Sequence, residues 1–395
     1  MSVVSQCSAQ ECVTSSIKIM KNTVKATRLA SLDILRGLDL WLLLMIGPVL
    51  HTFLRSGYGE SWEFIRFHAD HVPWEGFSLW DIIMPLFMFM SGITIPFSLR
   101  RYKEGLGSKK EFYLKLLKRF CLLVLFGWIV QGNLLDFDFR YFHPYANTLQ
   151  AIAVGYAASA LLFVYFRPKM QIVLTSLLFF GYMAAFVFTG MDVNPETNIA
   201  MVIDKAVLGA HRDGVRWLEN GDWQFSTWYQ YTWVLSSLNF IVTVMLGCFA
   251  GQMICAGGGE VSGRKALKLA VAGVALTAAG LAISPWFPIN KQLWSNSMTL
   301  YSGGISFLLI AATYYIVDVR KWGGKMAWIK YFGMNSIAAY MLANAVDFSS
   351  VTESFIYGLK DIASGFYPVL VAFGNVTILF FIMRLMYKNR IFLKV

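Results

Sequence analysis

Long, nearly uncharged apolar stretches constrain this 395-residue chain more than any other feature of its sequence. Each is close to the roughly 20 residues that a helix needs to cross a hydrocarbon layer. A backbone in lipid must satisfy its own hydrogen-bonding groups, and these stretches lack the polar–apolar alternation of barrel strands. We therefore predict an all-α, polytopic integral membrane protein with about ten transmembrane helices. The stretches lie at about 34–54, 77–99, 112–132, 146–166, 171–189, 232–256, 266–287, 298–318, 331–349 and 366–386.

The distribution of Lys and Arg predicts which helix ends face the cytoplasm. The connections assigned to one side, together with both chain ends, hold 25 of the 34 Lys and Arg residues, and the other side holds 8. Positive charge collects in cytoplasmic loops, so we expect both termini in the cytoplasm. This accounts for the net charge of +11 without a nucleic-acid partner. We expect a multi-pass protein of the cell inner (plasma) membrane, surrounded by lipid.

The chain divides into two regions and one long connection. Residues 1–27 are polar and predict a flexible cytoplasmic tail, whereas 28–395 predict a single transmembrane domain. The outward connection at 190–231 is rich in aromatic residues, and its length is typical of a functional loop or a small cap. Its aromatic side chains suit an interfacial belt or a surface for sugar rings, and both interpretations stay open.

Polar residues crowd the start of the second apolar stretch, in the segment HADHVPWEGFSLWD at 68–81. Pro73 and Gly76 predict a tight entry into the helix, which would hold His71 in one place, as a catalytic base requires. Asp81 follows ten residues later. It could orient the imidazole, or it could cap the helix N-terminus, where negative charge is favoured.

The first apolar stretch also contains ionisable residues. Asp33 and Arg36 are three positions apart, so they share a helix face and can pair. Ionisable groups within a membrane are costly and often functional. Two interpretations remain open: a structural ion pair, or a cationic site near the cytoplasmic mouth for a phosphorylated ligand.

The sequence predicts no metal site. His51, His68 and His71 share one outward stretch, but no carboxylate or thiolate ligand pattern accompanies them. The five cysteines have no metal-ligand spacing.

Four segments, taken together and in order, resemble a known enzyme family. They are RLASLDILRGLDL, HVPWEGFSLWDIIMPLFMFMSGITIPFSL, INKQLWSNSMTLYSGGISFLL and YFGMNSIAAYML. In them the chain resembles the heparan-α-glucosaminide N-acetyltransferase family, from about Arg28 to Met386. The resemblance implies an acyltransferase that takes acetyl from cytosolic acetyl-CoA. It delivers the acetyl group to the amine of a glucosamine-type sugar or glycan on the periplasmic or lumenal side.

The resemblance also implies that His71 is the active-site histidine. Around it we expect Asp81 to stabilise the imidazolium and Asn335 to donate an amide hydrogen bond. For the remaining contacts we expect Arg36, Asp33 and Ser336 at the CoA donor, and Trp74, Glu75 and Asn290 at the acceptor.

Two positions depart from the family pattern. The lysosomal enzyme of the family has a catalytic asparagine in its first span, whereas this chain has the pair Gly47–Pro48 near that place. A family stretch that usually carries a basic residue has Ala151 here. If the reaction needs the amide, another residue must supply it.

Several alternatives remain open on the sequence alone. Acetyl passes either directly to the acceptor or through an acetyl-imidazole on His71. An envelope polysaccharide or glycolipid O-acyltransferase would use the same histidine with a hydroxyl acceptor. A small-molecule transporter would also be polytopic, although inverted repeats are not evident. A homodimer is compatible with all of these.

Overall fold

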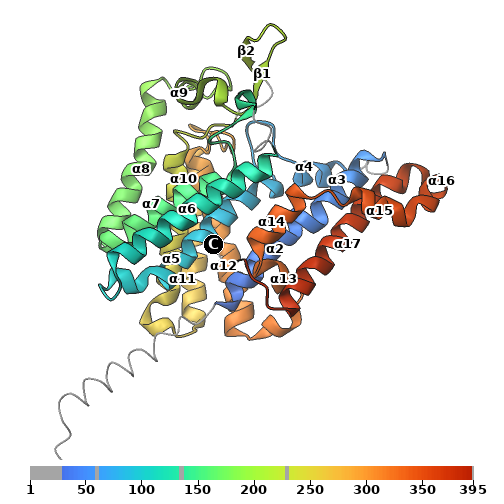
Figure 1. Ribbon diagram of the computed structural model, residues 1–395. Helices are drawn as coiled ribbons and strands as arrows, with labels where there is room; N and C mark the ends of the chain where they lie inside the picture. The colour runs from blue at the N-terminus through green and yellow to red at the C-terminus, as the bar shows by residue number, and fades with distance from the viewer. Residues whose placement is uncertain (1–28, 58–61, 133–137, 227–230, 394–395) are drawn as a thin grey trace, which may run out of the picture.

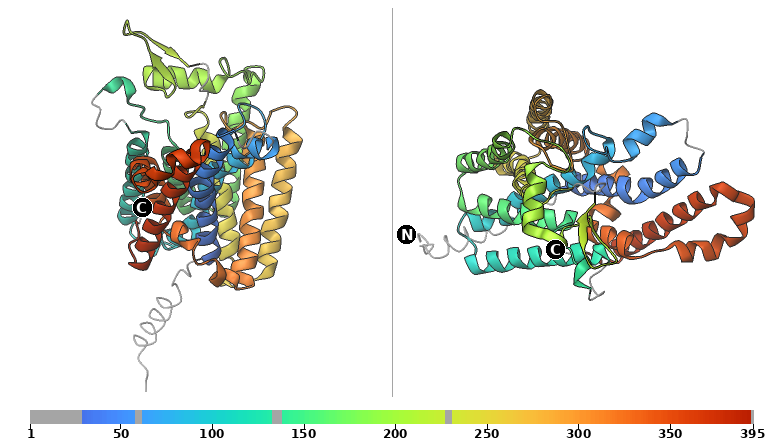
Figure 2. Two further views of the ribbon diagram at one scale, coloured as in Figure 1. Left: turned by 90° about the vertical axis from the view of Figure 1, so that its right-hand side faces the viewer. Right: turned by 90° about the horizontal axis from the view of Figure 1, so that it is seen from above.

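The computed structural model describes residues 29–57, 62–132, 138–226 and 231–393, so the tail predicted at 1–27 lies outside the described residues. Helices make up most of this part, and most of the long ones form one bundle (Figure 1). A small cap covers one end of the bundle (Figure 2). The expected class, an all-α polytopic membrane protein, is confirmed.

Eight helices of the described part are long and apolar enough to cross a membrane. By element they contain α2 (Ala30–Trp41) with α3 (Gly47–Arg55), α5 (Ile83–Lys103), α7 (Thr148–Tyr165), α8 (Pro168–Phe188), α10 (Ser237–Cys255), α11 (Gly263–Ile283), α12 (Asn296–Tyr314) and α17 (Tyr367–Lys388). The shorter helices of the described part include α4 (Glu63–Ala69), α9 (Ile199–Leu208), α15 (Ser349–Ile356) and α16 (Lys360–Ala363).

The count of eight differs from the predicted ten at two places. The third predicted span is α6 (Lys109–Gln131), a long helix whose first half carries several Lys and Arg residues. The ninth is broken into α13 (Lys330–Gly333) and α14 (Ser336–Ala345). Ten residues rise only about 15 Å in a helix, which is half of a hydrocarbon layer.

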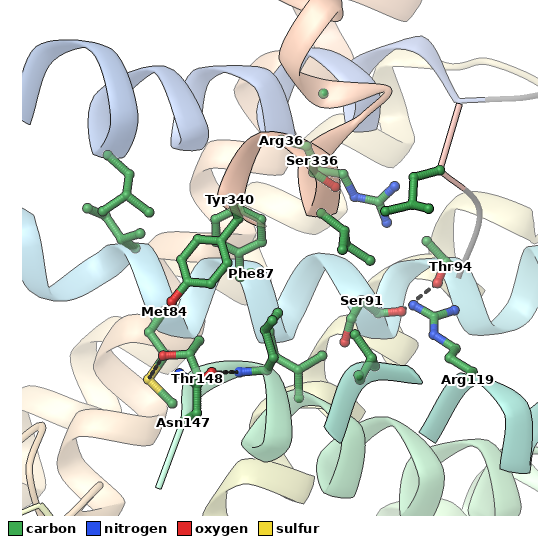
Figure 3. Close-up of a pocket in the computed structure, with 18 of the residues that line it drawn as sticks. Arg36, Met84, Phe87, Ser91, Thr94, Arg119, Asn147, Thr148, Ser336 and Tyr340 are labelled. Atoms are coloured by element: carbon green, nitrogen blue, oxygen red, sulfur yellow. Dashed lines mark hydrogen bonds between the residues drawn. The ribbon is translucent and has the colours of Figure 1, made fainter. Parts of the chain in front are cut away.

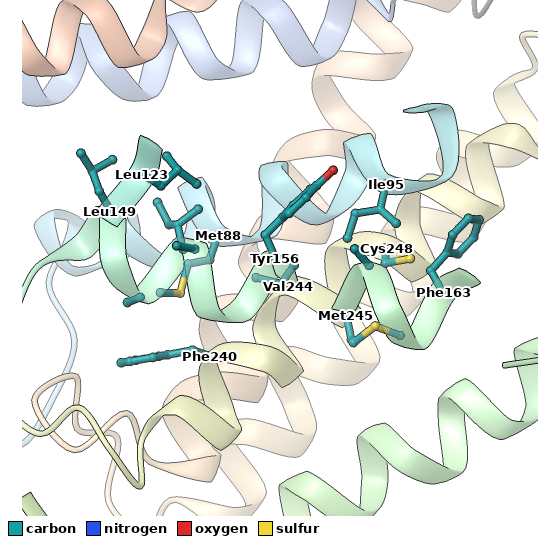
Figure 4. Close-up of a cluster of buried hydrophobic side chains, with 14 of the residues drawn as sticks. Met88, Ile95, Leu123, Leu149, Tyr156, Phe163, Phe240, Val244, Met245 and Cys248 are labelled. Carbon is teal, nitrogen blue, oxygen red and sulfur yellow. The ribbon is translucent and has the colours of Figure 1, made fainter. Parts of the chain in front are cut away.

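Helix α5 is the centre of the bundle and packs closely against α10 and α7. At Gly247 and Gly251 of α10, the backbone carbonyls of Phe89 and Ile93 occupy the space that a side chain would need. Small residues allow such close approach between membrane helices. A cluster of buried apolar side chains fills the space between these three helices (Figure 4). Because α5 is held so tightly, residues along it have fixed positions.

The cap is the folded part of the predicted outward connection. It contains α9 and a hairpin of β1 (Val215–Trp217) and β2 (Trp223–Phe225), paired antiparallel with Arg216 opposite Gln224.

Buried charged groups tie the cap to the segment that leads into α10. The Asp204 carboxylate accepts hydrogen bonds from the backbone N–H of Trp233 at 2.7 Å and of Val234 at 2.9 Å. The Asp213 carboxylate accepts from the indole N–H of Trp233 at 3.0 Å. Arg212 is fully buried and donates to the carbonyl of Tyr231 at 2.7 Å. Burial raises the pKa of Asp204 to about 6, although the two N–H donors oppose this shift. The cap therefore fixes Tyr231 and Trp233.

Candidate active site

His71 and Asp81 lie together at the start of α5. Nδ1 of His71 is 2.8 Å from Oδ1 of Asp81. The second carboxylate oxygen, Oδ2, accepts hydrogen bonds from the backbone N–H and the hydroxyl of Ser78, at 3.0 and 3.1 Å. Ser78 and Asp81 form a capping box for the first turn, Leu79–Ile82. Asp81 therefore both caps the helix and contacts the imidazole, so the two roles considered for it from the sequence occur at once.

Lys291 completes this group, and the sequence analysis did not single it out. Its Nζ lies 3.4 Å from Oδ1 of Asp81. It is also 3.0 Å from Nδ1 and 3.3 Å from Nε2 of His71. Burial lowers the pKa of Lys291 to about 8, and the neighbouring Asp81 opposes this shift. One sequence feature could have identified Lys291: it is an ionisable residue inside the INKQLW segment, next to Asn290.

The loop that carries Lys291 is rigidly fixed. Oδ1 of Asn290 accepts a hydrogen bond from the backbone N–H of Leu293 at 2.8 Å, and Ser295 Oγ accepts from the backbone N–H of Asn290 at 3.1 Å. The backbone N–H of Gly76 donates to the carbonyl of Ile289 at 2.8 Å, which joins this loop to the His71 segment. Two stretches more than 200 residues apart in the sequence are thus joined by a backbone hydrogen bond.

Only the histidine of this group is open to its surroundings. The His71 side chain is 42% exposed, whereas Asp81 is 2% and Lys291 is 9% exposed. A carboxylate only accepts hydrogen bonds, so Nδ1 of His71 carries the hydrogen and Nε2 keeps its lone pair. This arrangement suits a base whose free nitrogen meets a substrate.

A cavity of about 590 Å³ begins at His71 and Lys291 and continues along α5. One face of this helix and of the turn before it lines the cavity at helical spacing. The lining residues of this face are Trp80, Ile83, Met84, Phe87, Ser91, Thr94 and Ser98. The 18 positions from Trp80 to Ser98 rise about 27 Å, close to the ~30 Å of a hydrocarbon layer.

The two ends of the cavity differ in chemistry. The His71 end also includes Tyr231 and Trp233, which the cap fixes. The opposite end, here called the Arg36 end, includes Arg36, Arg119, Ser98, Ser336 and Leu393. In Figure 3, Arg36, Ser336, Thr94 and Arg119 lie toward one end of the α5 face, and Met84, Asn147 and Thr148 lie toward the other.

Two arginines from different helices face the Arg36 end. The Arg36 guanidinium donates to the carbonyl of Met90 at 3.4 Å. The Arg119 guanidinium lies 3.8 Å from the ring centroid of Tyr156. Ser336 is the first residue of α14 and also lines this end, whereas Asp33 is buried and does not line the cavity.

Two residues expected at the site, Asn335 and Asn290, bond backbone groups of their surroundings. Both polar atoms of the Asn335 amide bond the C-terminal segment: Nδ2 donates to the Ile391 carbonyl at 2.9 Å, and Oδ1 accepts from the Leu393 N–H at 3.1 Å. The Asn335 amide thus contacts the C-terminal segment rather than His71. Asn290 shapes the lysine loop and does not line the cavity.

Trp74, expected in the acceptor wall, does not line the cavity. Its indole N–H donates to the Val193 carbonyl at 3.1 Å, and its ring packs on an apolar cluster that includes Phe186 and Phe287. Glu75 is exposed and does not line the cavity.

Trp80 explains why position 47, where the family pattern leads one to expect an asparagine, is a glycine. A side chain at position 47 would meet the indole of Trp80, which lines the cavity. The second departure, Ala151, is fully buried in α7 and does not line the cavity.

His51, His68 and His71 do not converge. Nε2 of His51 contacts the carbonyl of Ala69, and Nδ1 of His68 faces the backbone N–H of Leu79 at 3.4 Å. Across the described ranges, no group of three or more His, Cys, Asp or Glu side chains has a metal-binding arrangement.

Comparison with known proteins shows what the whole chain is similar to. No protein-family model matches the chain. The chain is 25% identical over 367 residues to heparan-alpha-glucosaminide N-acetyltransferase of Mus musculus, and 25% identical over 365 residues to the enzyme of the same name from Homo sapiens. The matches cover 80% of this chain and 53% and 52% of the two relatives.

The helical architecture places the chain in the all-α class of polytopic membrane proteins. More particularly, the chain is a distant relative of heparan-alpha-glucosaminide N-acetyltransferase. The chain spans about half the length of the curated relatives it matches.

Proposed function

We propose that this protein transfers acetyl from acetyl-CoA, bound from the cytoplasmic side at the Arg36 end, to the amine of a glucosamine-type sugar at the His71 end. The observation that carries the proposal is the cavity along α5, which joins a cationic end to a histidine end over about the thickness of a membrane. The relatives are named for acetyl transfer to a glucosaminide, and this supports the choice of both substrates.

The Arg36 end suits the phosphate groups of CoA. Arg36 and Arg119 are permanently charged, and guanidinium groups bind phosphate through two parallel hydrogen bonds. Ser336 opens α14, and a helix N-terminus favours negative charge. The apolar middle of the cavity, at Phe87 and Ile337, suits the unbranched arm that carries the thioester.

His71 is the proposed general base. The acceptor amine attacks the thioester carbonyl carbon, and Nε2 of His71 takes a proton from the attacking nitrogen. Asp81 holds the opposite side of the ring and stabilises the imidazolium that forms. In this proposal acetyl passes directly to the acceptor, and the exposed side chain of His71, which lines the cavity proposed for both substrates, supports that route.

The acceptor would lie against the cap. Tyr231 and Trp233 line the His71 end, and aromatic surfaces beside polar groups suit sugar rings. These two residues replace Trp74 as the proposed wall of the acceptor site.

Acetyl transfer by the purified protein tests this proposal. Labelled acetyl-CoA and glucosamine are incubated with wild type, with His71→Ala, and with His143→Gln as a control. His143 contacts the carbonyl of His211 in the cap and does not line the cavity. We expect loss of about 10²- to 10⁴-fold in the rate for His71→Ala only. Absence of any acetylated sugar with wild type would contradict the proposed acceptor. Passage of acetyl-CoA through vesicles without transfer would favour a transporter.

A further inference from the structure

A buried lysine lies at the reacting end of the cavity, within hydrogen-bonding distance of the proposed base. Nζ of Lys291 is 3.3 Å from Nε2 of His71, and it lines the same cavity. Lysine is seldom buried, because removing its charge from water is costly unless a partner compensates. Asp81 is that partner at 3.4 Å, but the carboxylate is closer to His71 and Ser78. The ion pair with Asp81 alone therefore does not explain why a lysine is buried at this place.

The reaction needs a hydrogen-bond donor that the expected residues do not supply. When the acceptor attacks a thioester, negative charge develops on the carbonyl oxygen and must be stabilised. Asn335 is engaged by the C-terminal segment, and Gly47 has no side chain. The helix N-terminus at Ser78 is already occupied by Asp81.

Lys291 has the donors that are missing. An ammonium group has three N–H donors. Asp81 accepts one, and the neutral His71 ring offers a single lone pair at Nε2, which the proposed mechanism reserves for the proton of the acceptor. At least one N–H of Lys291 is left for a group in the cavity that it lines.

We infer that Lys291 is a catalytic residue whose ammonium group donates a hydrogen bond to the thioester carbonyl oxygen and stabilises the oxyanion of the tetrahedral intermediate. This inference rests on the proposed acetyl transfer. The amine nitrogen forms a bond to the carbonyl carbon, the C=O electron pair moves to oxygen, and Nε2 of His71 takes the amine proton. The carbonyl then re-forms, the C–S bond breaks, and the CoA thiolate takes the proton from His71. Lys291 stays protonated throughout.

A nucleophilic role for Lys291 is disfavoured by chemistry. Attack by Nζ on the thioester would give an amide on the enzyme, which is more stable than the thioester and would not pass acetyl to a sugar. A protonated lysine beside a carboxylate is also a poor nucleophile.

The inference makes the reaction depend on the charge of Lys291. The charged or titratable groups that contact it are Asp81 at the start of α5 and His71 on the segment before it, and Tyr231, on the segment before α10, lines the same cavity. His71 must be neutral and Lys291 protonated for activity. Activity should therefore be lost as the pH rises through the pKa of Lys291, about 8.

The test compares kcat, KM and pH profiles of the full-length protein, with acetyl-CoA and glucosamine as substrates. For Lys291→Met we expect kcat to fall by about 10²- to 10³-fold, while KM for acetyl-CoA changes less than about threefold. For Lys291→Arg we expect partial activity and an alkaline limb shifted well above that of wild type, because arginine stays charged. Lys360→Met, an exposed lysine on α16, is the matched control and should match wild type.

The outcomes separate this inference from the proposed function. If wild type transfers acetyl and Lys291→Met keeps its kcat, the inference is wrong and the proposed function stands. If Lys291→Met loses stability, the pH profile of Lys291→Arg decides, because a purely structural lysine would leave the alkaline limb in place. If wild type transfers no acetyl at all, both the inference about Lys291 and the proposed function are wrong.

Discussion

Oδ1 of Asp81 lies 2.8 Å from Nδ1 of His71, while Oδ2 of the same carboxylate closes the first turn before α5 at Ser78. One side chain thus joins the position of the proposed base to the helix that lines the whole cavity. Lys291 lies 3.4 Å from the oxygen that contacts His71, so removal of the carboxylate affects two partners.

Asp81→Asn should lower both activity and stability. The amide cannot stabilise an imidazolium as a carboxylate does, so we expect acetyl transfer to fall by about 10²- to 10⁴-fold. Lys291 would also lose its buried counter-charge, and breaking a buried pair costs about 3–5 kcal/mol. Steady-state rates and Tm measure the two effects. Asp361→Asn, an exposed carboxylate on α16, should change neither. A fully active Asp81→Asn protein would contradict the role given to this carboxylate.

Blocking the middle of the cavity should separate its two ends. Ser91 is buried and lines the cavity between them, so Ser91→Phe should abolish transfer while His71 and the Arg36 end stay intact. Binding of acetyl-CoA by calorimetry and product formation by mass spectrometry give the two readouts. Ala312→Phe, at an exposed position on α12, is the control for adding a large ring to a helix. Unchanged transfer by Ser91→Phe would show that the thioester does not pass along this face of α5.

Gly47 should not tolerate a side chain while Trp80 is present. A Cβ at this position would overlap the indole of Trp80, so Gly47→Ala should cost about 1–3 kcal/mol, seen as a lower Tm. Gly181→Ala, in the open space around α8, should be neutral or stabilising by up to about 1 kcal/mol, because the unfolded chain loses freedom. Measured in a Trp80→Ala background, Gly47→Ala should lower Tm less than it does in wild type, because the overlapping ring is gone. Equal Tm values for Gly47→Ala and Gly181→Ala would contradict this packing.

Asn335 should hold the C-terminal segment at the Arg36 end of the cavity. Replacing it with Ala leaves the Leu393 N–H and the Ile391 carbonyl without their partner, which costs about 1–3 kcal/mol locally. We expect faster hydrogen exchange at Leu393 and little change in peptides around His71. Asn389→Ala, which loses only one exposed hydrogen bond, is the control. Slow exchange at Leu393 in Asn335→Ala would contradict the proposal that Asn335 holds the C-terminal segment.

The sequence predicted local features of this molecule well. Apolar stretches of membrane-spanning length predicted the class, because each helix must satisfy its own backbone. The contact between His71 and Asp81 was anticipated because the nine intervening residues contain Pro73 and Gly76 and lead into one helix. The broken α13–α14 region matches the most polar of the predicted spans.

Contacts between distant segments were not predictable in the same way. Lys291 is 220 positions from His71, and only the packed bundle brings them together. Asn335 and Asn290 have the right chemistry for a site, but both polar atoms of the Asn335 amide and Oδ1 of Asn290 bond neighbouring backbone groups, which no local pattern reveals. The pairing of Gly47 with Trp80 likewise depends on how α3 crosses the start of α5.

Transfer across a sealed membrane tests the central claim most directly. The protein is reconstituted in vesicles, labelled acetyl-CoA is placed on one side only, and glucosamine on the other. We expect labelled N-acetylglucosamine on the acceptor side, at a rate that falls with His71→Ala, while CoA stays on the donor side. Product confined to the donor side, or formed equally by His71→Ala, would contradict a cavity that carries acetyl from the Arg36 end to His71.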